Sequence, residues 1–445
     1  MISVLMFYGT FLVCSALAVR TSVVFLFVLY QGVYFFNPAT KWWRYSIADL
    51  SYSFYIVLTL IIVVILKSEK IKVNNPLKVP QIRWLYVVVI LYCLASFYAI
   101  LPMPHKFAMD AFVTIAVVVS LGYILCDTEK DIDYLVYGYL YGAFYLSFYI
   151  FQFGRNQGDR VEGVGMVDAP DSNGVAAALA PAIVLCLYYF WVNTRMHTKL
   201  LFAVAGVFVA NALVLINSRG AFLGAAAGIT IFIYNMYFSS FQRKNQKLTV
   251  IFIVVCGLAG SLVLVDKSFL DRMATLKTET KINEDDESGA TRMAYWAAAV
   301  DMSKDFPLGA GASGFNYYSP VYIPQNINTG RSRNRSVHST WFETLSEIGY
   351  PGIFAFLMML WASFRTARIA KRKVKEAKNV DVYFKIIAIQ SALISFVVAM
   401  SFLNRLRAEV LYWLILYTAC IYNIYVLKPE KLKLASKKIL GNNDK

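Results

Sequence analysis

The segment Ser336–Leu360, "SVHSTWFETLSEIGYPGIFAFLMML", joins a polar stretch that contains a histidine to a run of apolar residues. One helical crossing of a lipid bilayer needs about 20 mostly apolar residues. The apolar run reaches that length when it is followed to residue 364. The segment therefore predicts a membrane-spanning helix over 344–364, with the histidine in the polar stretch just before that helix.

The same pattern recurs along the whole chain. Of its 445 residues, 58% are hydrophobic and 16% are charged, and the mean hydropathy is +0.54. Soluble domains are about a quarter charged. Because lipid tolerates no unpaired backbone, the spans must be helical. We expect an all-α polytopic membrane protein with 12 or 13 spans, drawn from residues 2–19, 21–36, 49–66, 83–101, 107–126, 132–152, 173–193, 198–216, 219–238, 248–266, 344–364, 384–404 and 408–428.

Lysine and arginine in short loops predict the orientation, since such loops stay in the cytoplasm. Four basic segments are placed there: 67–78, 241–247, 365–378 and the tail from 428. The long 267–343 loop and the 153–172 loop then lie outside. This predicts an N-terminal helix bundle (1–266), a large periplasmic loop (267–343), and C-terminal spans with a basic cytoplasmic tail (344–445).

The net charge of +16 and the six cysteines indicate no further class of function. Basic cytoplasmic loops explain the charge in a membrane protein, with binding of anionic lipid or phosphate as a second explanation, so we expect no nucleic-acid partner. The cysteines all lie in apolar runs, which predicts neither a disulfide framework nor a metal site.

Two arginines are candidate anion-binding groups on the predicted outer side. Arg219 opens "NSRGAFLGAAAGI", whose small residues allow close helix packing. The alternative for Arg219 is a side chain that only extends to the lipid interface. Arg292 lies in "GATRMAYWAAAVDMSKDFPLGAGASGF", where 290–304 has helical spacing. The glycines after Pro307 predict a tight turn, with a phosphate-binding loop as the alternative.

His338 is the candidate general base. Its ordinary pKa lies close to neutrality, which suits removal of a proton from a hydroxyl. A structural hydrogen-bonding role is the alternative. Glu343 and Glu347 follow on the same predicted helix, where they either orient His338 or form its polar start.

Further polar residues are predicted to bind substrate. The run "RSRNR" precedes His338, and a solvated face is the alternative for it. Arg405 and Arg407 lie in the last outer loop. The 153–172 loop leads to Asn173, for which a helix cap is the alternative. The acidic cluster "NEDDES" (Asn283–Ser288) lacks calcium-loop spacing. The predicted substrate-binding residues are Arg160, Asn173, Arg331, Arg333, Arg335 and Arg405.

Taken in order, "NSRGAFLG", "RMAYWAAAVDMSKDFPLGAGASGF" and "HSTWFETLSEIGYPGI" resemble the motifs of the O-antigen ligase and O-antigen polymerase superfamily. Ser339 stands where many members have asparagine. The N-terminal "YQGVYFFNPATKWWRYS" is more weakly similar to O-glycosylation ligases found with exosortase systems.

The resemblance implies a reaction at the bacterial inner membrane, on its periplasmic side. The donor would be a glycan on undecaprenyl diphosphate and the acceptor a sugar hydroxyl of lipid A–core, among membrane lipids. By this analogy His338 is the base, Arg219 and Arg292 hold the diphosphate, and neither a metal nor a cofactor takes part. An O-antigen polymerase or a protein O-oligosaccharyltransferase would share the chemistry. A lipid-linked glycan flippase is a more remote alternative.

Overall fold

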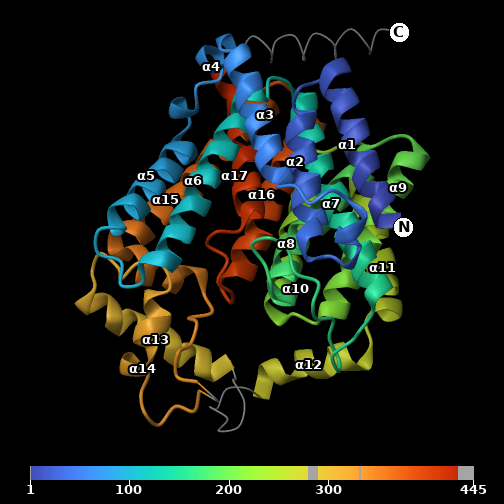
Figure 1. Cartoon of the computed structure of the whole chain (residues 1–445). Coiled ribbons are helices and arrows are strands. Elements are labelled where there is room, and N and C mark those ends of the chain that lie inside the picture. The colour runs from blue at the N-terminus through green and yellow to red at the C-terminus, as the bar shows by residue number, and fades with distance from the viewer. Residues whose placement is uncertain (1, 279–288, 330–331, 429–445) are drawn as a thin grey trace, which may run out of the picture.

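The computed structural model describes residues 2–278, 289–329 and 332–428, which form a bundle of helices (Figure 1). Within these ranges every regular element is a helix. The α-helices are α1 (Ile2–Arg20), α2 (Phe25–Phe36), α3 (Tyr52–Leu66), α4 (Glu69–Val73), α5 (Pro80–Ala95), α6 (Pro102–Leu125), α7 (Glu129–Phe153), α8 (Ser172–Val192), α9 (Met196–Ile216), α10 (Arg219–Phe238), α11 (Gln246–Leu264), α12 (Lys267–Thr278), α13 (Gly289–Asp305), α14 (Gly314–Tyr322), α15 (Thr340–Glu376), α16 (Val380–Met400) and α17 (Glu409–Tyr422).

The all-helical polytopic fold is confirmed, and each predicted span contains a helix. By length and apolarity, 9 helices of the described residues can cross a membrane, or 10 if the bent pair formed by Glu69–Lys78, which includes α4, and by α5 is one span. This is fewer than the predicted 12 or 13. Helices α2 and α3 have only 12 and 15 residues, and α7 is rich in tyrosine and begins with acidic residues.

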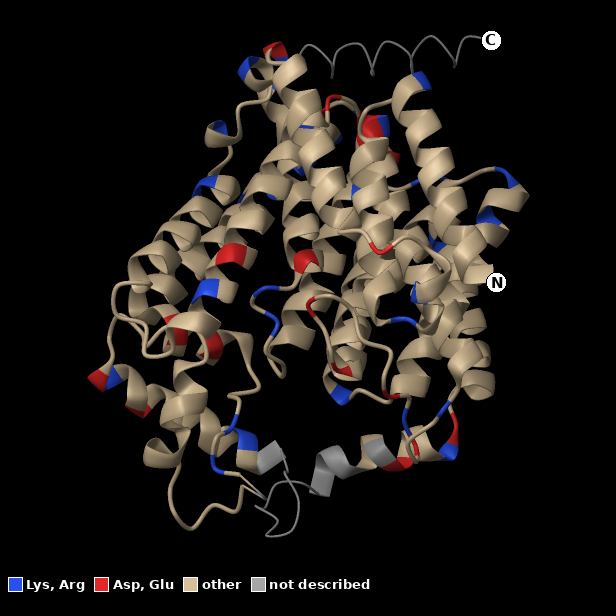
Figure 2. Ribbon diagram, in the orientation of Figure 1, with Lys and Arg blue, Asp and Glu red and all other residues tan. Residues whose placement is uncertain are grey.

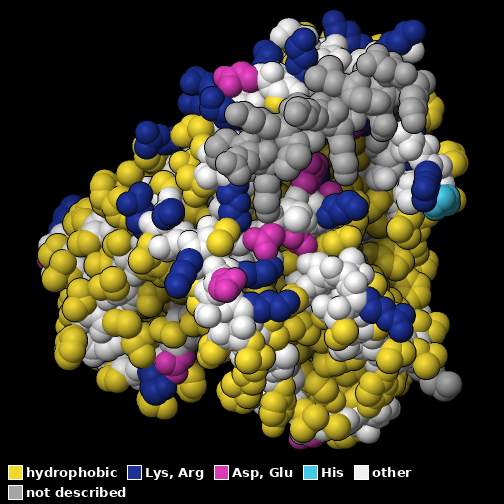
Figure 3. All heavy atoms as spheres, turned by 90° about the horizontal axis from the view of Figure 1, so that it is seen from above, with side chains coloured by type: hydrophobic (Ala, Val, Ile, Leu, Met, Phe, Trp, Pro, Cys, Tyr) yellow, Lys and Arg dark blue, Asp and Glu magenta, His cyan; other side chains and the backbone are white. Residues whose placement is uncertain are grey.

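The bundle has two chemically different ends. Helices α12, α13 and α14 lie at one end, called here the loop end, and α4 lies at the other, called the basic end (Figure 1). Charged residues concentrate toward the two ends, with long uncharged helix between them (Figure 2). Lysine and arginine side chains outnumber acidic ones on the face of the basic end (Figure 3). Its assignment to the cytoplasm stays a prediction.

Helix α10 packs against α16 through glycines, as its small residues predict. A Cβ atom on Gly224 would lie 2.4 Å from the Ser395 carbonyl oxygen, and one on Gly228 would lie 2.8 Å from that of Ser391. Such close approach of two backbones is possible only for residues without a side chain. The contact fixes the start of α10, and with it Arg219, beside the end of α16.

Helix α15 is broken at Ile348 and Gly349, and the break docks on the glycine-rich turn after α13. Three backbone hydrogen bonds of 2.9–3.0 Å join the two segments: Ala310 N–H to Ser346 O, Gly311 N–H to Glu347 O, and Tyr350 N–H to Pro307 O. The N–H groups of Ala312 and Ser313 also donate within the protein, to His105 and Glu347, so the turn has little left for a phosphate. The predicted tight turn is therefore confirmed over the phosphate-binding alternative.

Gly349 should not tolerate a side chain. Its φ is +63°, and a Cβ atom would lie 2.1 Å from the Pro307 carbonyl oxygen. Gly349→Ala is expected to cost about 1–3 kcal/mol for the backbone conformation alone and to lower the apparent Tm of the detergent-purified protein. Gly257→Ala is the matched control, because a Cβ atom there meets nothing within 4 Å. Equal Tm values for the two variants would contradict the close contact between the break in α15 and the turn after α13.

Candidate active site

Residues 401–408, called here the α16–α17 loop, are the meeting point of three segments far apart in the sequence. Arg292 donates from Nη1 to the carbonyl oxygen of Phe402 over 3.4 Å. A Cβ atom on Gly220, next to Arg219, would lie 3.2 Å from Cβ of Phe402. The loop therefore brings the starts of α10 and α13 together at the loop end.

His338 lies against the same loop. The backbone N–H of the following residue, Ser339, donates to Oδ1 of Asn404 over 3.0 Å. On the other side, Trp296 of α13 donates from Nε1 to the carbonyl oxygen of Val337 over 3.0 Å. The structure thus places His338 between α13 and the loop that Arg292 also contacts. Arg219, Arg292 and His338 are each half-buried, so part of each side chain remains accessible.

The other two histidines have different surroundings. His105 is buried, with Nε2 2.9 Å from the Tyr92 carbonyl oxygen, and its Nδ1 accepts the Ala312 N–H over 3.1 Å. His197 is exposed at the start of α9, at the basic end. His338 is therefore the histidine placed near the two arginines.

The two arginines and His338 lie in a segment that matches a known protein family. Residues 204–357 match the family model described as O-antigen ligase, a range that includes Arg219, Arg292 and His338. This match supports membership of the chain in the O-antigen ligase superfamily. No curated protein sequence matches it significantly. The match covers the part of the chain from α9 to the first half of α15, and it stops before the α16–α17 loop.

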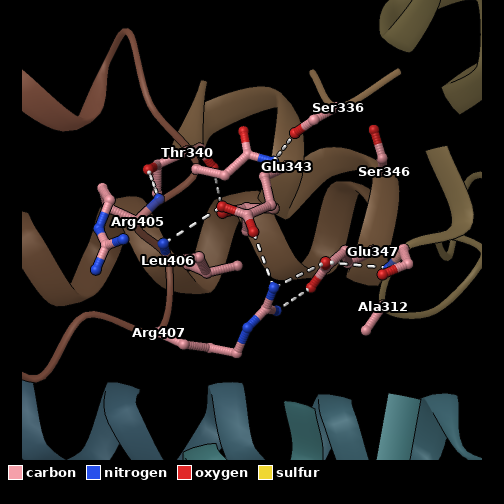
Figure 4. Close-up of polar contacts among 12 residues, drawn as sticks. Ala312, Ser336, Thr340, Glu343, Ser346, Glu347, Arg405, Leu406 and Arg407 are labelled. Carbon is pink, nitrogen blue, oxygen red and sulfur yellow. Dashed lines mark hydrogen bonds and ion pairs between the residues drawn. The ribbon is translucent and has the colours of Figure 1, made fainter. Parts of the chain in front are cut away.

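The two glutamates of α15, Glu343 and Glu347, bind Arg407 (Figure 4). Arg407 contacts Glu343 at 2.9 Å and Glu347 at 2.6 Å, and both glutamate side chains are only 6% exposed. Burial lowers the pKa of Arg407, but the two carboxylates raise it by more, so it lies well above its ordinary value. Glu343 also accepts the Leu406 N–H over 3.3 Å. These contacts fasten the α16–α17 loop to α15.

Arg405, a predicted substrate-binding residue, is also in a buried ion pair. Its side chain is 4% exposed and lies 2.8 Å from Asp168 of the loop before α8. Asp168 in turn accepts from the Tyr34 hydroxyl and the Glu409 N–H, each over 2.8 Å. The contacts favour a role for Arg405 in holding the site together.

Arg160 and Asn173 contact each other. Arg160 donates from Nη2 to Oδ1 of Asn173 over 2.8 Å and from Nε to the Ile216 carbonyl oxygen over 3.2 Å. The side chain that caps α8 is that of Asp171, which accepts the Gly174 N–H, so Asn173 is not the cap. Arg160 thus ties the loop before α8 to the end of α9, close to Arg219 in the sequence.

The "RSRNR" run binds its own segment. Arg333 donates to the carbonyl oxygens of Ile323, Pro324 and Ile327, and Arg335 donates to that of Thr329. Both arginines are half-buried, which differs from a fully solvated face. Arg331 and the "NEDDES" cluster lie outside the described residues.

All six cysteines are free thiols. Among the described residues, no group of three or more His, Cys, Asp or Glu side chains is arranged to hold a metal ion. Whether the reaction uses a metal stays a matter for experiment.

Sequence reasoning missed two residues of this site. Asn404 and Trp296 bind the backbone on either side of His338. In the sequence, Trp296 was identified only as part of a motif, and Asn404 was identified only as the residue that precedes Arg405. Neither stands at a spacing that indicates a contact with His338, since the contacts join residues about 40 and 65 positions apart.

Removal of Arg407 should destabilise the protein. Arg407→Met would leave two buried carboxylates without their cation, and breaking a buried ion pair typically costs about 3–5 kcal/mol. The apparent Tm in detergent should fall clearly. Lys304→Met is the matched control, because its pair with Asp301 is 67% and 58% exposed, and such pairs contribute about 0–1 kcal/mol. A Tm for Arg407→Met equal to that of the control would contradict the stabilising role of the ion pairs between Arg407 and the two glutamates.

Proposed function

We propose that the chain is an inverting, metal-independent glycosyltransferase that moves a glycan from undecaprenyl diphosphate to a sugar hydroxyl of lipid A–core. The observation that carries the proposal is the convergence of Arg219, Arg292 and His338 on the α16–α17 loop. Family membership and the bundle of apolar helices support a lipid-linked glycan as substrate. The inner membrane and its periplasmic face are the proposed location.

The proposed chemistry follows from these three side chains. His338 takes the proton of the acceptor hydroxyl as its oxygen attacks the anomeric carbon of the donor sugar. The bond from that carbon to the diphosphate oxygen breaks, and undecaprenyl diphosphate leaves with the electron pair. Attack opposite the leaving group inverts the anomeric configuration. Arg219 and Arg292 stabilise the negative charge that grows on the diphosphate, for which fixed guanidinium groups are well suited.

The position of the site suits a lipid-linked donor. Arg219 opens α10, and His338 lies just before α15. Both helices can cross a membrane. A diphosphate at the polar border would meet the arginines while its polyprenyl chain remains among apolar side chains. The predicted substrate-binding residues that the structure describes bind nearby parts of the chain, which favours their shaping the site around the donor.

The acceptor separates the alternatives. An O-antigen polymerase or a protein O-oligosaccharyltransferase would use the same base and the same cations, and would differ only in which hydroxyl attacks. A flippase would need no base at all. The placement of His338 against the loop that the two arginines also approach therefore favours a transferase over a flippase.

Loss of the base should slow transfer far more than it weakens donor binding. General-base catalysis typically contributes about 10²–10⁴-fold, so His338→Ala should lower kcat by that factor with donor binding largely intact. Arg219→Ala and Arg292→Ala should also abolish measurable transfer. His197→Ala is the matched control, because that histidine is exposed at the opposite end. Wild-type transfer by His338→Ala would remove it as the base.

The acceptor can be identified by parallel assays of purified protein with a polyprenyl-diphosphate glycan. We expect product on lipid A–core, and not on free glycan–lipid or protein, and we expect EDTA to leave the rate unchanged. A lengthened donor or a glycosylated protein would identify a polymerase or a protein transferase. Strict dependence on a divalent metal would contradict the role given to the arginines. Donor binding without transfer to any acceptor would favour the flippase.

A further inference from the structure

The backbone at His338 is held in an unusual conformation. Its φ is +52°, in the left-handed region. A non-glycine residue there costs about 1–3 kcal/mol and persists only where surrounding contacts over-determine it. One amide supplies two of those contacts: Asn404 Oδ1 accepts the Ser339 N–H over 3.0 Å, and Asn404 Nδ2 donates to Ser336 Oγ over 2.6 Å. The side chain of Asn404 therefore bridges the chain on both sides of His338.

We propose that Asn404 is a positioning residue that fixes the orientation of His338 for proton removal. The proposal rests on the function proposed above for His338. A general base must lie within about 2.6–3.2 Å of the proton-bearing oxygen, and a misplacement of 1 Å can cost about 10²-fold in rate. A carboxamide suits this role, because it accepts one hydrogen bond and donates another in a fixed plane.

The same loop also connects the base to the cations. Thr340 Oγ1 donates to the Leu403 carbonyl oxygen over 2.8 Å, next to Asn404. Arg292 contacts the carbonyl oxygen of Phe402, two residues before Asn404. The loop thus sets the spacing between the group that takes the acceptor proton and a group that faces the leaving diphosphate. Asn404 is the member of the loop whose side chain contacts the His338 segment twice.

Three variants test this role by their effect on kcat. Asn404→Leu keeps a similar side-chain volume and loses both hydrogen bonds, so kcat should fall about 10–100-fold with the donor KM within about twofold of wild type. Ser336→Ala loses only one of the two hydrogen bonds, so its kcat should lie between those of the wild type and Asn404→Leu. The double variant should be no slower than Asn404→Leu alone, because the Ser336 contact acts through Asn404. Asn326→Leu is the control, on an exposed asparagine of the loop end.

The outcomes separate this inference from the proposed function. If His338→Ala is inactive while Asn404→Leu and Ser336→Ala keep wild-type kcat, the positioning role is wrong and the base stands. If His338→Ala is fully active, both are wrong. A fall in kcat that only follows a smaller folded fraction, measured by donor binding per mole of protein, would identify Asn404 as structural and overturn the inference. Ser336→Ala, a mild change, keeps the test valid if Asn404→Leu fails to fold.

Discussion

The backbone pairing between the turn after α13 and the break in α15 is the contact on which the rest of the site depends. In an unbroken helix, Ser346 O would accept the Tyr350 N–H; here it accepts from Ala310, and Tyr350 donates to Pro307 instead. Glu347 O would have no helical donor at all, because Pro351 lacks an N–H, and Gly311 supplies one. Each group released by the break finds a partner, as a buried backbone requires.

This pairing explains why two motifs far apart in the sequence occur together. The turn needs glycine at 309 and 311, where φ is +83° and +81°. The break needs Gly349 and Pro351. Neither segment satisfies its backbone alone. Once docked, the turn fixes the end of α13, and the first part of α15 fixes the segment that carries His338. These backbone hydrogen bonds therefore hold the helix that carries Arg292 and the segment that carries His338 in place relative to each other, together with the contacts of the α16–α17 loop.

Arg405 and Arg407 are distinguished among the arginines of the loop end by their ion pairs with largely buried carboxylates. Arg405 and Arg407 carry their charge against carboxylates that are 14% exposed or less. An anionic ligand would have to displace those carboxylates in order to bind them. Arg219 and Arg292 are half-buried and lie where α10 and α13 approach the α16–α17 loop. The ion pairs of Arg405 and Arg407 fix the loop, and Arg219 and Arg292 are the cations that we propose meet the diphosphate.

Sequence alone predicts the features that have a local pattern. Apolar runs located the spans, small residues predicted the close packing of α10, and the glycines after Pro307 predicted the turn. The short lengths of α2 and α3 were not predicted, because the polar residues at the starts of the two spans (Thr21 and Ser22, Asp49 and Ser51) were counted within them. The role of Glu343 and Glu347 was left open for a different reason. Their partner Arg407 lies about 60 residues away, and a single polar contact at that distance leaves no periodic signal.

Ser339 shows how a departure from a family pattern can be understood only in three dimensions. Many relatives are expected to carry asparagine at this position, and the Ser339 hydroxyl is buried without a hydrogen-bond partner. An unsatisfied buried polar group costs about 1–3 kcal/mol, so the serine side chain itself does not explain the local order. A carboxamide is nevertheless present, because Asn404 brings one to the Ser339 N–H from the neighbouring loop. A carboxamide therefore lies beside this position, contributed by a residue beyond the range of the family match.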